Sequence, residues 1–130
     1  MRADERVDGA VVEWDLEVVS LGQLRAAVQR LLEPLSGIGV EDAVQVCDGL
    51  ASNAVVHARA PRGCRLMVAG HGWLRVEVDD ASPAPARIRR PDHIGGRALI
   101  LVDQLATYWG VDYHGCGKTV WAELGTRCGG

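Results

Sequence analysis

The segment 73–80, WLRVEVDD, constrains the fold more than any other stretch, because its apolar and polar residues alternate strictly. A period of two residues is typical of a β-strand with one covered face and one face open to solvent. Leu74, Val76 and Val78 fall on the covered side, and the charged residues between them fall on the open side. The chain therefore needs a sheet with a second layer packed against it.

The rest of the chain contains segments that can form that layer. Apolar residues at helical spacing predict helices at about 21–35 and 40–58, and we expect a third at about 96–106. Ser20 and Gln23 have the spacing of a capping box at the first helix. Further β-rich stretches lie at 11–19, 64–69, 108–113 and 118–124. Because helices are few and most strands adjoin by hairpins, we predict an α+β two-layer sandwich with helices on one face of a mixed sheet.

Length and composition indicate one domain that folds around a single core. The chain has 130 residues, of which 48% are hydrophobic, and we place the domain at 11–125 with a flexible N-terminus at 1–10 and a flexible tail at 126–130. The net charge of -3 argues against nucleic acid as a partner. No apolar run is long enough for a membrane, and the polar N-terminus does not resemble a secretion signal. Four cysteines without a C-x-x-C pair are typical of reduced thiols, so we expect a cytoplasmic protein.

The run Gly117-Lys118-Thr119 resembles the end of a phosphate-binding P-loop, but two features argue against one. The motif requires glycine at the position of Asp112, and it requires a helix where this chain continues with the alternating residues 119–124. A tight hairpin turn around Gly115 and Gly117 is the simpler interpretation. The H-x-C pair at 114–116 has no nearby residues to complete a tetrahedral metal site.

Three polar features interrupt the apolar faces. Gly49, Asn53 and His57 share one face of the second helix, which is either a solvated stripe or part of a site. By the alternation of its strand Asp80 points inward, where a carboxylate needs hydrogen-bond donors, although the turn-like sequence DASP also fits an Asx-turn. The glycines at 95–96 precede an apolar helix whose N-terminal N–H groups can bind an anion. Together these features suit Mg²⁺, an adenine amino group and phosphate in one cavity.

Four segments then resemble a known family. LASNAVVHA, VDDASPAPA, GGRALILVDQLATYWG and GKTVWAEL are similar, in this order, to the boxes of the GHKL (Bergerat-fold) ATP-binding domains, which include gyrase and the histidine kinases. The similarity is greatest to the anti-sigma-factor serine kinases, and it extends over about 11–124. It implies that ATP or ADP with Mg²⁺ is held between the sheet and the helices, under a lid at 84–94. In the lid, Arg87, Arg89 and Arg90 either reach phosphate or are solvated.

The resemblance also assigns roles to residues. Asn53 is expected to coordinate Mg²⁺ bound to the phosphates, with His57 on the same helix face, and Asp80 is expected to receive the adenine amino group. Ser82 and Pro83 would shape the turn below the base, and Thr119 would lie near the contact between Asp80 and adenine. The backbone of the third helix start would face the phosphates, at Gly95, Gly96, Arg97, Ala98 and Leu99.

Two departures from the family pattern leave catalysis open. The glutamate that usually precedes the magnesium-binding Asn by one turn is replaced by Gly49, and the adjacent Asp48 is only a weak catalytic candidate. Ala98 stands where the box after the lid usually has glycine. Losing a positioned acid–base group typically lowers the rate by about 10²–10⁴ and affects binding less. We therefore expect nucleotide binding more firmly than kinase activity.

Three functions remain open on the sequence alone. The chain could be a serine kinase that binds a sigma factor and phosphorylates an antagonist, or a nucleotide-gated binding module without catalysis. It could also be a protein-interaction domain on a degenerate fold that does not turn over nucleotide. Relatives in this branch are often homodimers. The four tryptophans lie in predicted strands and are interpreted as core or interface residues.

Overall fold

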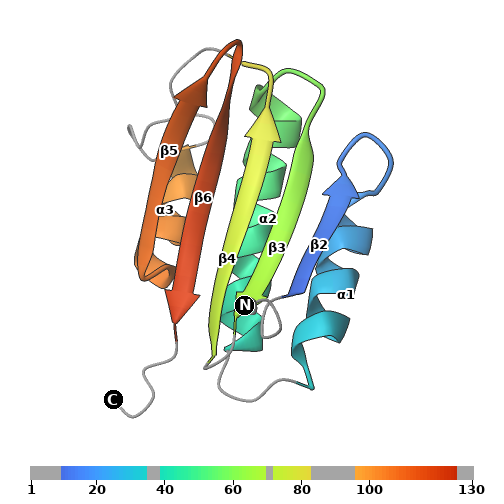
Figure 1. The fold of residues 1–130 in the computed structure, drawn as a ribbon, viewed down its shortest axis with the longest axis vertical. Helices are drawn as coiled ribbons and strands as arrows, with labels where there is room; N and C mark the ends of the chain where they lie inside the picture. The colour runs from blue at the N-terminus through green and yellow to red at the C-terminus, as the bar shows by residue number, and fades with distance from the viewer. Residues whose placement is uncertain (1–9, 35–38, 70–71, 83–95, 126–130) are drawn as a thin grey trace, which may run out of the picture.

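A computed structural model describes residues 10–34, 39–69, 72–82 and 96–125 (Figure 1). The expected lid at 84–94 lies outside the described residues. So do the expected flexible ends, except for Ala10, which begins the first strand. Within the described residues no helix is both long and apolar enough to span a membrane.

The sheet has five strands in the order β2-β3-β4-β6-β5. The strands are β2 (Ala10–Asp15), β3 (Gly63–Ala69), β4 (Trp73–Asp80), β5 (Tyr108–His114) and β6 (Gly117–Gly125). Each pair of neighbours is antiparallel, so the prediction of a mixed sheet was wrong for the described strands. Strand direction depends on how the chain returns to the sheet, and the periodicity of a single strand carries no information about it.

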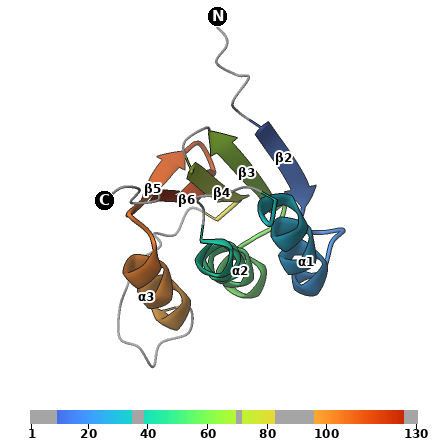
Figure 2. The ribbon, with the colours of Figure 1, turned by 90° about the horizontal axis from the view of Figure 1, so that it is seen from below.

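Three helices cover one face of this sheet, and no described helix covers the other, which is called the open face (Figure 2). They are α1 (Leu21–Leu32), α2 (Val40–His57) and α3 (Gly96–Leu105), with α2 between the other two. The predicted capping box of α1 is present, because Ser20 Oγ accepts a hydrogen bond from Gln23 N, and Gln23 Oε1 accepts one from Ser20 N. The predicted two-layer α+β sandwich is confirmed.

The first strand is shorter than its β-rich sequence predicted. Asp15 ends it with a turn: its carboxylate accepts a hydrogen bond from Glu17 N at 2.8 Å, and its carbonyl accepts from Val18 N and Val19 N. An aspartate that satisfies the following N–H groups in this way competes with continuation of the strand. The β-branched residues at 18–19 were therefore a misleading signal for strand.

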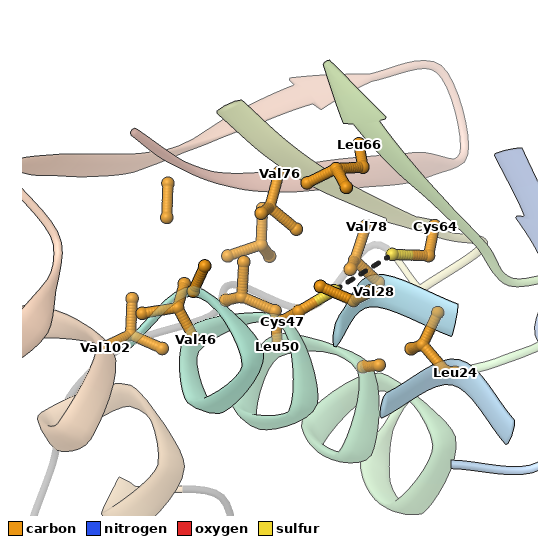
Figure 3. Close-up of a cluster of buried hydrophobic side chains, with 14 of the residues drawn as sticks. Leu24, Val28, Val46, Cys47, Leu50, Cys64, Leu66, Val76, Val78 and Val102 are labelled. Carbon is orange, nitrogen blue, oxygen red and sulfur yellow. Dashed lines mark hydrogen bonds between the residues drawn. The ribbon is translucent and has the colours of Figure 1, made fainter. Parts of the chain in front are cut away.

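The core lies between the sheet and the three helices, as the alternation in β4 predicted. Leu74 and Val76 are fully buried and Val78 is 1% exposed. Figure 3 shows Val76 and Val78 on the side of the sheet that faces Leu50 and Cys47 of α2. Cys47 of α2 and Cys64 of β3 also meet there, with their sulfur atoms 3.8 Å apart, so a weak S–H hydrogen bond joins the two layers.

The hairpin predicted from the glycines at the end of the chain is confirmed. Gly115 and Cys116 connect β5 to β6, and Gly115 has a φ of 51°, a conformation that glycine adopts without strain. Gly117 is required for another reason, because a Cβ atom there would overlap the carbonyl oxygen of Asp80. The start of β6 therefore approaches the end of β4 closely.

The tryptophans divide between the two faces of the sheet. Trp14 and Trp109 are packed against the core. Trp121 lies on the open face, where the Arg75 guanidinium is 4.4 Å from the centre of its ring. Trp73, on the same face, has its ring 6.4 Å from that of Tyr108.

Candidate functional site

The strongest candidate for a ligand contact is Asp80, the last residue of β4. Its side chain is 2% exposed and lies on the helix-covered side, as the strand parity predicted. Its Oδ1 accepts a hydrogen bond from Ser82 N at 2.7 Å, so the Asx-turn suggested by the sequence is present as well. The two interpretations of this residue are therefore compatible, because one carboxylate oxygen closes the turn while the group as a whole points inward.

Lys118 is the partner of Asp80 that sequence reasoning missed. It lies directly opposite Asp80 in the register of β4 and β6. Its Nζ is 2.9 Å from Asp80 Oδ2 and 3.1 Å from Oδ1, and its side chain is 7% exposed. The signal was in the sequence, because Lys118 shares its parity with the buried residues Val120 and Ala122. A lysine at a core-facing position requires a charge partner.

The turn after Asp80 is attached to the end of α2. Ser82 Oγ accepts a hydrogen bond from Arg59 N at 2.7 Å, and Ala81 N donates to Arg59 O at 2.9 Å. Ser82 is itself buried. These bonds fix the position of the Asp80 carboxylate relative to the helix that carries Asn53.

The C-terminal end of α2 is held in turn by Arg62. This guanidinium donates to Val55 O at 2.7 Å and forms an ion pair with Glu17 at 2.8 Å. A cation at the last carbonyl groups of a helix satisfies acceptors that have no partner within the helix. The hydrogen bond from Arg62 lowers the pKa of Glu17 below its ordinary value.

Asn53 and Asp48 lie on different flanks of α2. Asp48 accepts a hydrogen bond from Arg25 of α1 at 2.8 Å, so it points toward α1. Asn53 follows five residues later, and at about 100° per residue the two side chains leave the helix in well-separated directions. Gly49 and the exposed His57 are one turn before and one turn after Asn53, so they share its flank of the helix. The aspartate next to Gly49 is thus directed away from the side that carries Asn53.

The half-buried Asn53 is the residue that fits a magnesium–phosphate group. No described residue forms a hydrogen bond with its side chain, and its amide oxygen is a hard ligand of the kind that Mg²⁺ accepts. Mg²⁺ usually takes one or two protein ligands and completes its shell with phosphate oxygens and water. Asn53 would supply one protein ligand to such an ion.

At the start of α3 the structure describes the backbone, and it is this backbone that the site would use. The helix begins at Gly96, so Arg97 and Ala98 lie in its first turn, while Gly95 is outside the described residues. The N–H groups of a first helical turn have no acceptor within the helix. Leu99 packs into the core at 2% exposure.

Thr119 lies on the open face of the sheet, beside Asp79 rather than Asp80. Its hydroxyl donates to Asp79 Oδ1 at 2.5 Å, and its oxygen is 2.8 Å from His114 Nε2. The place beside Asp80 that we expected for Thr119 is taken by Lys118. Because side chains alternate along β6, only one of these two neighbours can face the helices.

Arginines pair with the acidic residues of the open face. Arg65 contacts both Glu77 and Asp79, at 2.7 and 2.5 Å, and Arg75 joins Glu77 to Glu123. Burial alone would raise the pKa of Asp79, but hydrogen bonds from Arg65 and Thr119 outweigh it and hold that pKa below the ordinary value. A shallow hollow at this end of the face is lined by Pro61, Asp79, His114, Cys116, Gly117 and Thr119, among others.

Comparison with known proteins identifies the fold. No protein-family model and no curated protein sequence matches the chain. The structure of the RsbU and RsbW domains of Rv1364c from Mycobacterium tuberculosis is similar, with a TM-score of 0.66 and 17% identity over 91% of this chain and 32% of that one. The chain thus spans about a third of that protein.

Two histidine kinases are similar as well. The histidine kinase domain of the Erythrobacter litoralis EL346 blue-light activated kinase matches with a TM-score of 0.50 and 24% identity, over 82% of this chain and 59% of that one. Acinetobacter baumannii histidine kinase AdeS matches with a TM-score of 0.54 and 10% identity, over 91% and 68% of the two chains. At these identities the matches establish the fold, and this chain has the GHKL-type fold that the sequence segments predicted.

Proposed function

We propose that this protein binds ATP or ADP with Mg²⁺ on the helix-covered side of the sheet and uses the nucleotide to control its binding to a partner protein. The observation that carries the proposal is the Asp80 carboxylate, buried at the end of a core strand and held in place by Ser82 N and Lys118. An ionised carboxylate offers about four acceptor positions, and described residues fill three of them. The remaining position, on Oδ2, can accept a hydrogen bond from the adenine amino group.

The phosphate end of the ligand is assigned to Asn53 of α2 and to the start of α3. Asn53 would coordinate Mg²⁺, and the first turn of α3 would present N–H groups to the phosphates. Ser82 and Arg59 connect the adenine end to α2. Nucleotide bound across these elements would contact the sheet, α2 and α3 together. Its binding would thus favour one arrangement of these elements, and with it one form of the surface that a partner contacts.

A nucleotide-gated switch is favoured over a kinase. The position one turn before Asn53 is Gly49, which has no acid–base group, and Asp48 is occupied by Arg25 on the far flank of the helix. By similarity to a protein that contains an RsbW domain, the partner would be a sigma factor or its antagonist, in the cytoplasm. A homodimer would fit the same family resemblance.

Calorimetry with ATP and ADP, with and without Mg²⁺, tests the binding. We expect Asp80→Asn to weaken both nucleotides, and Asn53→Ala to remove chiefly the dependence on Mg²⁺. The matched control is Asp79→Asn, which changes the adjacent carboxylate on the opposite face and should leave affinity unchanged. Thermal unfolding of each variant separates lost contact from lost fold. A wild-type protein that binds neither nucleotide at millimolar concentration would favour the interaction domain without nucleotide.

Transfer of radiolabelled phosphate to the antagonist protein then separates the kinase from the switch. Wild type with verified ATP binding and no transfer supports the switch. Gly49→Glu restores the carboxylate that the family carries at this position, and a gain of transfer in that variant would show that the missing group alone limits catalysis.

A further inference from the structure

We propose that Lys118 is a specificity-determining residue that, together with Asp80, reads the Watson–Crick edge of the base. Lys118 would donate a hydrogen bond to adenine N1 while Asp80 accepts one from the N6 amino group. This inference rests on the proposed nucleotide site and adds to it the residue that distinguishes one base from another.

The position of Lys118 is the first support. It lies opposite Asp80 across β4 and β6, and both side chains are on the face that the helices cover. The Asp80 and Lys118 side chains are 2% and 7% exposed, so neither is a surface group that happens to lie nearby. Gly117 holds this part of β6 close to β4, because any larger residue would overlap the Asp80 carbonyl.

The hydrogen-bonding capacity of the pair is the second support. A lysine ammonium has three N–H donors and no acceptor. Contacts to Oδ1 and Oδ2 of Asp80 account for two of the three among the described residues. Counted over the described residues, one donor of Lys118 and one acceptor position of Asp80 Oδ2 thus remain, on two atoms that lie 2.9 Å apart.

A ligand that satisfies both must carry an N–H donor next to an acceptor on one edge. Adenine has this pattern, since its N6 amino group is adjacent to N1. Ser82 N and Lys118 Nζ both donate toward Asp80, so its carboxylate oxygens act as acceptors in this arrangement. A base that presents an acceptor to Asp80 and a donor to Lys118 would leave two buried charges facing the wrong partners, which is strongly disfavoured.

The experiment uses wild-type protein and analogues that alter one atom of the base. In 1-deaza-ATP a C–H group replaces N1, and in 7-deaza-ATP the replaced atom is N7, away from the proposed contact. We expect 7-deaza-ATP to bind like ATP, and 1-deaza-ATP to bind at least about tenfold more weakly, because it leaves a buried ammonium donor without its acceptor. Equal affinity for 1-deaza-ATP and ATP would overturn the proposal. So would tighter binding of GTP than of ATP.

Substitutions assign the effect to Lys118. In Lys118→Met the preference for ATP over 1-deaza-ATP should disappear, whereas Lys118→Arg, which keeps the charge and the donors, should retain part of it. If Lys118→Met does not fold, the comparison of ATP with 1-deaza-ATP and 7-deaza-ATP on the wild-type protein still tests the proposed contact. A wild type that binds no adenine nucleotide would refute the proposed function itself, while ATP binding without discrimination at N1 would refute only the role of Lys118.

Discussion

Asp79 and Asp80 are adjacent in sequence, yet they are held by opposite faces of the sheet and in different ways. Asp79 lies on the open face, contacts Arg65 and Thr119, and its side chain remains 32% exposed. Asp80 lies under the helices at 2% exposure and forms an ion pair with Lys118 at 2.9 Å. On the open face the charges form a network that water can reach, whereas on the helix-covered face Asp80 and Lys118 form a single buried ion pair.

The comparison distinguishes charges in this sheet that stabilise the fold from charges that can contact a ligand. On the open face each arginine contacts two carboxylates, so the loss of one contact leaves another. On the covered face, desolvation makes each polar atom of the pair depend on its partner. A site that recognises a ligand by hydrogen bonds gains specificity from such dependence.

The largest expected effect is that of Lys118→Met, which leaves the Asp80 carboxylate buried without its cation. We expect a loss of about 3–5 kcal/mol in the free energy of unfolding, measured by urea denaturation. Combining it with Asp80→Leu should recover part of the loss, because the uncompensated charge is removed. A loss no greater than that of an open-face arginine would contradict the distinction between the two faces.

Gly117→Ala should have the next largest effect. The new methyl group would overlap the Asp80 carbonyl and move β6 away from β4, at a cost of about 1–3 kcal/mol. Gly63→Ala is the matched control in the same sheet, because its Cβ would meet Trp14 O at an ordinary 3.6 Å. Thermal unfolding of both variants measures the contrast, and equal stability would count against the close approach.

Arg65→Met tests the open face and should cost only about 1 kcal/mol, because its side chain is 28% exposed and the remaining network persists.

The two faces should also respond differently to salt. Raising the ionic strength to 1 M shortens the screening length to about 3 Å, which should diminish the effect of Arg65→Met and leave that of Lys118→Met nearly unchanged. Similar salt dependence for both substitutions would mean that water reaches both pairs.

The smallest of the expected effects is the loss of stability when acid protonates the carboxylates of the open face. The pKa values of Asp79 and Glu77 lie below their ordinary values of 3.8 and 4.5, so these groups release protons more readily in the folded state. Their contribution is complete above the ordinary values and is lost as the pH falls through the lowered ones. We expect less than about 1 kcal/mol between pH 5 and pH 3 to depend on Arg65, measured by comparing wild type with Arg65→Met.

Local features of the fold could be predicted because they depend on neighbouring residues. The capping box at Ser20, the inward direction of Asp80 and the hairpin at Gly115 each follow from spacing alone. The antiparallel order of the whole sheet could not be predicted this way, since it depends on how distant strands pair. The early end of β2 at Asp15 was missed because a side-chain hydrogen bond overrode the β propensity of the residues that follow.

The candidate site was predicted in part for the same reason. Asp80 was found because its strand alternates cleanly, and the same rule applied to β6 would have identified Lys118 as an inward cation. The GKT run drew attention to Thr119 instead, although each of its three residues contacts the end of β4 in a different way. The expected roles of Asn53 and of the α3 start remain predictions, which the nucleotide titrations address.

The reactivity of the two thiols between α2 and β3 can be used to measure how often the helix and the sheet separate. Cys47 and Cys64 are each 1% exposed, and the hydrogen bond with Cys64, followed by burial, raises the pKa of Cys47. A thiol reagent can therefore react there only after the helix separates from the sheet. Cys116 is exposed and should be modified at once. The slow phase of alkylation therefore measures how often the layers part, and a nucleotide that joins them should lengthen it.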